Sequence, residues 1–243
     1  MLRFGFLLAA APLFAQGPAM DLVLLLENTQ GVQHNLSAND FHALRAEDRV
    51  AVMTFSSKSH VVQAFTSDPD KAAAALRRSR IGVRLPRPVF LSSVTPKTRL
   101  FRALMDAAQL YRDLPLDPSR RRVIVLVFGT DDDSYKPTFD ELKRTLTTAQ
   151  IKLYAVAIRR HDFTRAQDPR IQTPPTIPGQ HPPVTTDLAP PPETTLKTLS
   201  NLVAAVGGEA VSGDAKVSGV FDRARSGPNQ PQKLRLVAGE HTP

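Results

Sequence analysis

The chain has 243 residues, of which 42% are hydrophobic and 22% are charged, and its net charge is +8. This composition is typical of a globular protein with one large core or two small ones. The absence of cysteine excludes disulfides, thiolate metal sites and cysteine nucleophiles. Tryptophan is also absent, and no aromatic residues are interleaved with the arginine clusters at Arg77-Arg78 and Arg120-Arg121-Arg122. We therefore expect a solvated basic surface and no nucleic-acid partner.

The first residues predict an export signal. Arg3 precedes an apolar segment from Phe4 to Phe14, which is well short of the ~20 residues that span a bilayer. Ala15 followed by Gln16 is a small-residue cleavage position. We expect residues 1–15 to be removed, no transmembrane segment to remain, and the mature protein to be secreted or periplasmic.

The apolar run from Leu22 to Leu26 predicts a central strand, the first of the chain. A strand buried on both faces of a parallel sheet has such an unbroken Val/Leu pattern. The run ends in polar and small residues, Glu27-Asn28-Thr29-Gln30-Gly31. Ligand sites of open α/β sheets form just past the carboxyl ends of parallel strands, so this stretch is the first candidate for a site.

Strands and helices are predicted to alternate along the rest of the chain. Ser37 to Asp40 is a helix start, and Asp68-Pro69 opens a helix that continues to about Arg78. Apolar residues recur at helical spacing from Leu100 to Tyr111. The further predicted strands are Val50–Phe55, a short piece at Val61-Val62, Val123–Phe128, Ile151–Ile158 and Glu209–Val211, and the further helices start at Thr138 and Leu196. This order predicts a doubly wound, mostly parallel α/β sheet with helices on both faces.

One domain is expected over residues 20–212. It contains a proline-rich insertion at 161–193, because nine of the 21 prolines lie between Asp168 and Pro192. That composition favours an extended or disordered loop. Residues 213–243 are predicted to form a tail with a short helix near Val217 and a strand near Leu234.

These motifs, taken in order, resemble those of a von Willebrand factor type A domain. The stretch from Asp21 to Gly31 is similar to the family's opening strand with its D-x-S-x-S metal motif. Four further stretches carry the resemblance: Asp48-Arg49-Val50 through Phe55-Ser56, Thr98-Arg-Leu-Phe-Arg-Ala-Leu104, Arg122 to Ser134, and Val206-Gly-Gly-Glu-Ala210. Among members of the family, the leader ending Phe-Ala-Gln is most similar to that of exported acidobacterial proteins. The resemblance implies a non-enzymatic protein-binding or adhesion module.

The family's metal-ion-dependent adhesion site holds a divalent cation, usually Mg²⁺, through hard oxygen ligands. Compared with that pattern, Glu27 replaces an aspartate, Thr29 keeps a hydroxyl, and Thr98 keeps the family's threonine. Gly31 and Gly129 lie where the family has side-chain ligands. The resemblance therefore implies a degenerate site, and we expect no resident cofactor.

This edge of the sheet has three interpretations. In the first, it binds a protein partner, with or without metal, through Glu27, Asn28, Thr29, Gln30, Thr98, Asp131, Asp132 and Asp133. In the second, a divalent cation such as Mg²⁺ is held by a remodelled set, Glu27, Thr29, Thr98 and Asp131. The third is a secreted hydrolase that uses Glu27 and Asp131 as a carboxylate pair. No set of nucleophile, base and orienting group can be assembled for it, so we expect no catalytic residues.

Overall fold

The computed structural model describes residues 18–29, 34, 36–42, 44–81, 99–129, 139–158, 193–212 and 217–226. The predicted signal at 1–15, the proline-rich insertion before residue 193 and the predicted strand near Leu234 lie outside the described residues.

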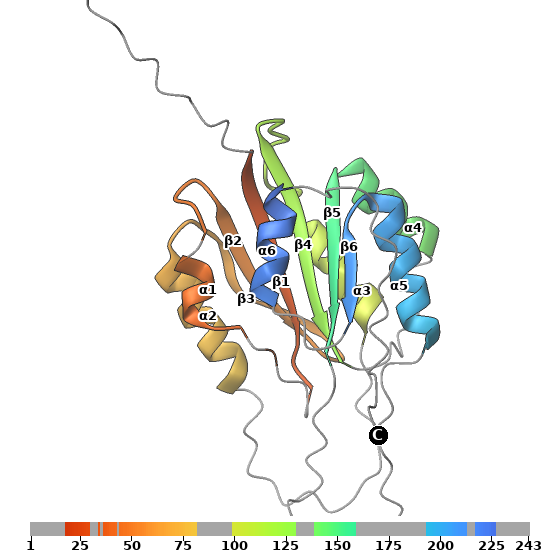
Figure 1. Cartoon of the computed structure of the whole chain (residues 1–243), viewed down its shortest axis with the longest axis horizontal. Helices are drawn as coiled ribbons and strands as arrows, with labels where there is room; N and C mark the ends of the chain where they lie inside the picture. Colours follow the sequence, from red (N-terminus) through yellow and green to blue (C-terminus); the bar gives the residue numbers. More distant parts are fainter. Residues whose placement is uncertain are drawn as a thin grey trace, which may run out of the picture.

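Six strands form one sheet in the order β3-β2-β1-β4-β5-β6 (Figure 1). Neighbouring strands are parallel, except that β3 runs antiparallel to β2. The mostly parallel α/β sheet predicted from the sequence is therefore confirmed. The strands are β1 (Ala19–Glu27), β2 (Arg49–Phe55), β3 (Ser59–Thr66), β4 (Arg120–Phe128), β5 (Ile151–Ala157) and β6 (Glu209–Ser212).

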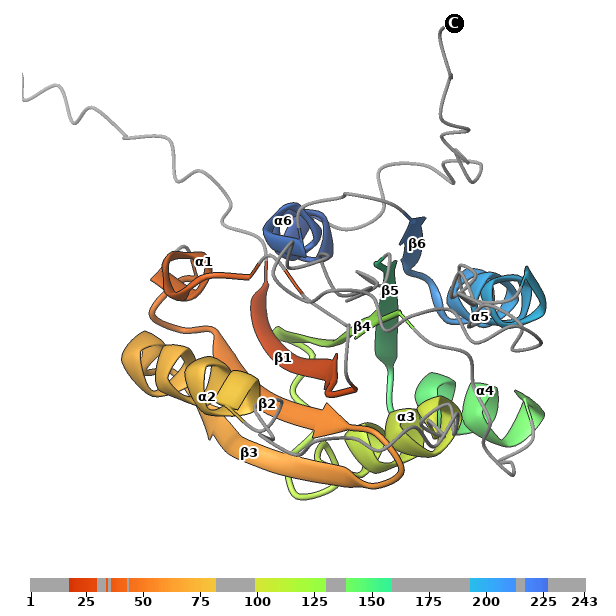
Figure 2. The same cartoon turned by 90° about the horizontal axis from the view of Figure 1, so that it is seen from below.

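Helices cover both faces of the sheet (Figure 2). One face carries α1 (Ala38–His42), α2 (Pro69–Ile81) and α6 (Val217–Ser226), and the other carries α3 (Leu100–Gln109), α4 (Phe139–Thr148) and α5 (Glu193–Val206). The predicted start of α2 is confirmed, since Asp68 Oδ1 accepts the backbone N–H groups of Asp70 and Lys71. Within the described ranges, none of the helices has the length and apolar character of a bilayer-spanning segment.

β1 is the most enclosed strand of the sheet. Its residues from Met20 to Glu27 are all buried. Alternate side chains point to opposite faces, so Leu22, Leu24 and Leu26 pack with the α1, α2 and α6 layer, while Val23 and Leu25 pack with the α3, α4 and α5 layer. The unbroken apolar pattern of this strand follows from its double burial.

The sequence underestimated β3. Only Val61-Val62 was predicted as extended, whereas the strand has eight residues and lies at the edge of the sheet. Its pairing with β2 is interrupted by irregularities on either side of Val52. An edge strand is partly exposed, and Val61 is itself exposed, so β3 lacks the continuous apolar run that marked the inner strands.

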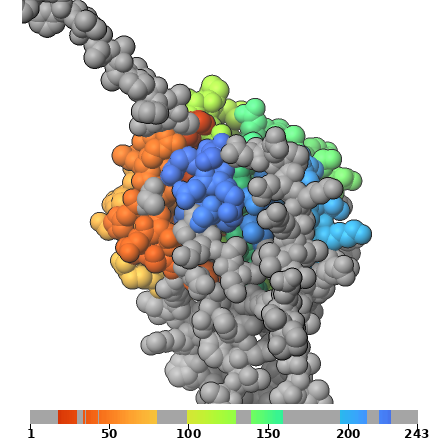
Figure 3. Space-filling view, viewed as in Figure 1, coloured from red at the N-terminus to blue at the C-terminus, as the bar shows by residue number. Residues whose placement is uncertain are grey.

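Helix α6 packs on the sheet beside α1. Phe221 is buried, and its ring centroid lies 6.4 Å from that of Phe41. Arg121 Nη1 donates to the carbonyl oxygens of Ala224 and Arg225 at 2.8 and 2.6 Å. These two carbonyl groups in the last turn of α6 thereby gain a hydrogen-bond donor. In the space-filling view, α6 (blue) is flanked by the orange segment that contains α1 (Figure 3).

The predicted solvated basic surface is wrong for Arg120-Arg121-Arg122. Arg122 is buried and donates to the carbonyl oxygens of Leu114 and Pro115 at 2.7 and 3.0 Å. Arg121 joins β4 to α6, and Arg120 is bound to the buried carboxylate of Asp21. The guanidinium groups have acceptors within the protein, and those of Arg120 and Arg121 lie on segments distant in sequence, which composition does not reveal.

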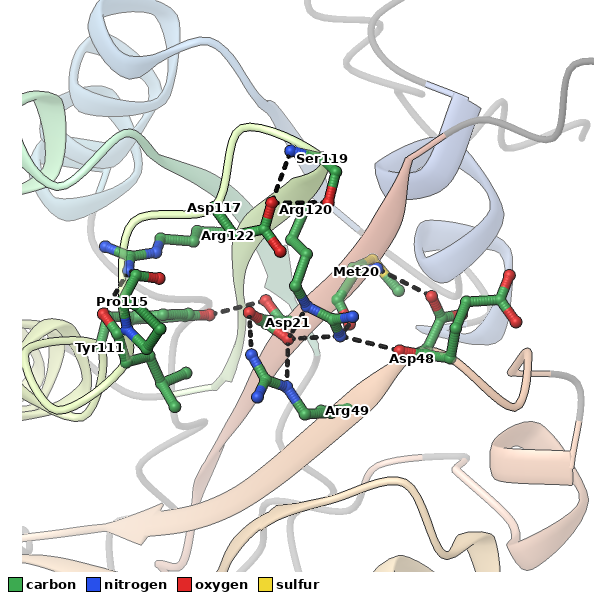
Figure 4. Close-up of polar contacts among 12 residues, drawn as sticks. Met20, Asp21, Asp48, Arg49, Tyr111, Pro115, Asp117, Ser119, Arg120 and Arg122 are labelled. Atoms are coloured by element: carbon green, nitrogen blue, oxygen red, sulfur yellow. Dashed lines mark hydrogen bonds and ion pairs between the residues drawn. The ribbon is translucent and has the colours of Figure 1, made fainter.

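Asp21, at the amino end of β1, is the centre of a charged cluster (Figure 4). Arg49 binds it through both carboxylate oxygens at 2.7 Å, and Arg120 donates to Oδ1 at 2.9 and 2.7 Å. The hydroxyl of Tyr111 lies 3.0 Å from Asp21 O and 2.5 Å from Val123 O. The cluster ties β2, β1 and β4 together where the strands begin.

The Asp21 cluster predicts acid-sensitive stability. Burial by itself raises the pKa of Asp21, but hydrogen bonds and charges from Arg49 and Arg120 outweigh it and hold the pKa below its ordinary value. The resulting stabilisation is present above the ordinary pKa and is lost as the pH falls towards the lower value of the folded state. Asp21→Asn should cost about 3–5 kcal/mol at neutral pH, because it leaves two guanidinium groups without their carboxylate.

Urea unfolding between about pH 7 and pH 3 tests this, over the range where such a group titrates. The wild type should lose stability more steeply than Asp21→Asn as the pH falls. Parallel pH profiles for the two proteins would contradict the role of Asp21.

Helix α6 is predicted to contribute to the core. Phe221→Ala should destabilise the protein by about 3–5 kcal/mol, because it removes a buried ring. Asp222→Ala is the matched control on the same helix: the Asp222 side chain is 76% exposed, and its loss should cost within about 0.5 kcal/mol. Equal thermal midpoints for the two variants would show that α6 does not stabilise the fold.

Candidate functional site

The candidate site lies at the edge of the sheet where β1, β2, β4 and β5 end together, at the lower side of Figure 1. Glu27 is the last residue of β1, and Asn28 and Thr29 come directly after it. In a parallel sheet the first residues after neighbouring strands meet at one edge. Gly129, the first residue after β4, therefore lies next to the end of β1.

Glu27 is held by hydrogen bonds to both carboxylate oxygens. Its Oε1 accepts the Thr29 hydroxyl at 2.5 Å, and its Oε2 accepts the backbone N–H of Gly129 at 2.7 Å. Glu27 is 3% exposed and Thr29 is 4% exposed. A buried carboxylate is costly unless hydrogen-bond donors satisfy it, and these two donors do so from within the protein.

Backbone hydrogen bonds fix the loops on either side. Asn28 N donates to Phe55 O at 2.7 Å, which holds the segment after β1 against the end of β2. Ser56, the residue after Phe55, accepts the backbone N–H of Arg99 through its carbonyl oxygen at 2.9 Å. The start of α3 is thereby held at the end of β2. Lys58 and Arg99 are both exposed. They give this side of the edge two positively charged side chains.

The structure brings together only part of the predicted set. Glu27, Asn28 and Thr29 lie together at the edge, whereas Gln30, Gly31, Thr98 and the loop residues Asp131, Asp132 and Asp133 lie outside the described residues. Neither the distance from Glu27 to Asp131 nor the remodelled metal set is therefore tested.

Sequence reasoning missed the role of Gly129. It was considered only as a position without a side-chain ligand, but its backbone N–H is a donor to Glu27. The available signal was the combination of a glutamate at the end of β1 with a glycine after β4. A longer carboxylate opposite a residue without a side chain can reach the backbone of the neighbouring strand.

Of the remodelled cation set, the structure describes Glu27 and Thr29. Each oxygen of Glu27 accepts a hydrogen bond. In the part of the chain that the structure describes, no three His, Cys, Asp or Glu side chains gather as a metal-binding group. Mg²⁺ needs six oxygen ligands in near-ideal octahedral geometry, so Glu27 and Thr29 would supply only part of such a set.

Comparisons with known proteins agree with this fold. Residues 27–132 match the family model of the von Willebrand factor type A domain. No curated protein matches the chain. An aerotolerance-related membrane protein from Bacteroides fragilis, carrying multiple mutations to serine, aligns with a TM-score of 0.52 at 12% identity, over 86% of this chain and 100% of that chain.

Proximal thread matrix protein 1 of the mussel byssus aligns with a TM-score of 0.50 at 9% identity, over 86% of this chain and 46% of that chain. A further structure of that mussel protein, with a zinc-occupied metal-ion-dependent adhesion site, has a TM-score of 0.48 at 11% identity, over 86% of this chain and 47% of that chain. Structural likeness at such low identity concerns the fold alone.

The fold and the edge define an open α/β domain of the kind that places binding loops at the carboxyl ends of its strands. Together with the family match, they establish that the chain contains a von Willebrand factor type A domain. Domains of this family mediate protein interactions.

The Thr29 hydroxyl is predicted to stabilise the site. Thr29→Val keeps the shape of the side chain but leaves a buried carboxylate oxygen without this donor, which should cost about 1–3 kcal/mol. Thr29→Ser keeps the hydroxyl and should retain most of the stability. Urea unfolding of the two variants gives the comparison, and equal losses would mean that the methyl packing of Thr29 matters rather than its hydrogen bond.

Proposed function

We propose that the mature chain is an exported, non-enzymatic binding module that presents the carboxyl-end edge of its sheet to a protein partner without needing a divalent cation. The observation that carries the proposal is the state of Glu27, which stands at the first ligand position of the family's metal site. Its carboxylate is buried and bonded to Thr29 and Gly129. The edge is thus ordered by internal contacts.

The exposed part of this edge supports binding by surface contact. Lys58 and Arg99 are exposed beside the segment after β1, and their backbones are fixed through Ser56. Charged groups around an edge steer the approach of a partner and select among partners. The predicted face residues Gln30, Thr98 and Asp131 to Asp133 belong to this proposal and would extend the same surface.

Export is proposed from the sequence of residues 1–15, with cleavage before Gln16. A secreted or periplasmic location is expected from that signal, and an adhesive role from the family resemblance. The cation-dependent alternative relies on Thr98 and Asp131 in addition to Glu27 and Thr29. Nothing in the described residues favours the hydrolytic alternative.

Partner capture tests the proposed edge. The chain beginning at Gln16 is used to capture partners from the envelope fraction of its source. The double variant Lys58→Glu/Arg99→Glu should reduce capture by at least about tenfold, as expected for reversed charges at an interface. Arg112→Glu is the matched control, since exposed Arg112 lies past the far end of α3 while Arg99 precedes its start. Equal loss in the control would refute the assignment of the face.

Calorimetric titration distinguishes the cation-dependent alternative from the metal-free proposal. Mg²⁺, Mn²⁺ and Ca²⁺ should show no submillimolar binding to the wild type, and partner capture should be the same in EDTA and in magnesium. Submillimolar binding that disappears in Glu27→Ala would overturn the metal-free proposal and support the remodelled site.

A further inference from the structure

Glu27 makes a contact between β1 and β4 beyond the end of their backbone pairing. The β1–β4 ladder ends at Leu26 and Val127. Backbone hydrogen bonds continue past the strand ends on the two sides, from Asn28 N to Phe55 O for β1 and β2, and from Ile158 N to Phe128 O for β4 and β5. Between β1 and β4, the corresponding bond is made by the Glu27 side chain to the N–H of Gly129.

The length of the glutamate side chain matters for this contact. An aspartate at this position would hold its carboxylate one carbon–carbon bond, about 1.5 Å, closer to its own backbone. The 2.7 Å bond to Gly129 N would then lengthen to about 4 Å, beyond hydrogen-bond range. Aspartate would therefore leave a gap between the two segments, which glutamate spans.

Thr29 and Gly129 complete the contact. The Thr29 hydroxyl donates to the other carboxylate oxygen and limits rotation of the carboxylate group. The N–H of Gly129 directs a partial positive charge at the buried anion. Two fixed donors of this kind stabilise a carboxylate strongly when water is excluded.

We propose that Glu27 is a built-in crosslink that joins the carboxyl ends of β1 and β4 and takes the place of a bridging cation. The family resemblance places a cation between the ends of β1 and β4. Glu27 already joins the two ends, because it is itself a residue of β1 and its side chain accepts a hydrogen bond from Gly129 after β4. Glu27 is thus a positioning residue that holds the binding edge, not a contact residue for the partner. The inference rests on the proposed function and deepens it, because it explains how the edge stays ordered without metal.

Two substitutions at Glu27 test the crosslink. Glu27→Gln keeps the length: its amide oxygen can accept from Gly129 while its NH₂ donates to the Thr29 oxygen. Glu27→Asp keeps the charge but shortens the side chain. In EDTA, the folding equilibrium constant should fall by about 10–100-fold in Glu27→Asp, the range for a lost hydrogen bond to a charged group. It should fall much less in Glu27→Gln.

The equilibrium constants are measured by urea unfolding, first in EDTA and then with magnesium chloride in place of EDTA. Glu47→Gln and Glu47→Asp serve as controls at an exposed glutamate near the other end of the sheet. The wild-type midpoint should not depend on magnesium. If magnesium stabilises the wild type and Glu27→Gln abolishes that effect, Glu27 is a metal ligand and the crosslink is wrong. If Glu27→Gln is destabilised as much as Glu27→Asp in EDTA, charge rather than reach is decisive, and the crosslink is also wrong.

These outcomes are independent of partner capture. A failed crosslink with charge-dependent capture at Lys58 and Arg99 would leave the binding face intact. A confirmed crosslink without such capture would remove the proposed function while keeping the role of Glu27.

Discussion

The structure depends on keeping β1 buried on both faces between β2 and β4. Polar groups on such a strand must be satisfied from within the protein, because water does not reach them. β1 carries one carboxylate near each end, Asp21 and Glu27, and both are bonded to the segments beside it. The central strands are thereby fixed to one another at the amino end and at the carboxyl end of the sheet.

The two carboxylates are satisfied in different ways, and the difference bears on function. Asp21 is neutralised by two full positive charges, those of Arg49 and Arg120, which suits a structural position. Glu27 has a hydroxyl and a backbone N–H as its two identified donors, and it lies where the family's domains expose a binding site. In the proposed function, a carboxylate committed to these donors orders the edge, and recognition falls to side chains that reach solvent.

Local patterns predicted the elements whose signals are local. The buried strands appeared as apolar runs such as Leu22 to Leu26, and α3 as apolar residues at helical spacing. The contacts that matter most were not predictable in this way, since Asp21 is bonded to residues 28 and 99 positions away. The Glu27–Gly129 bond spans 102 positions and uses a backbone donor, so its only sequence signal is a glutamate at the end of β1 combined with a glycine after β4. Edge strand β3 was largely missed because its exposed side has no apolar run.

In the proposed crosslink, a side chain of the protein, and not a cation, joins the ends of β1 and β4. Hydrogen exchange of the Gly129 amide, followed by NMR, reports directly on that bond. The amide should be protected in the wild type to the same extent in EDTA and in magnesium, and protection should be lost in Glu27→Ala. Rapid exchange of Gly129 in EDTA, with protection appearing only when magnesium is added, would show that a cation and not Glu27 joins the two strands.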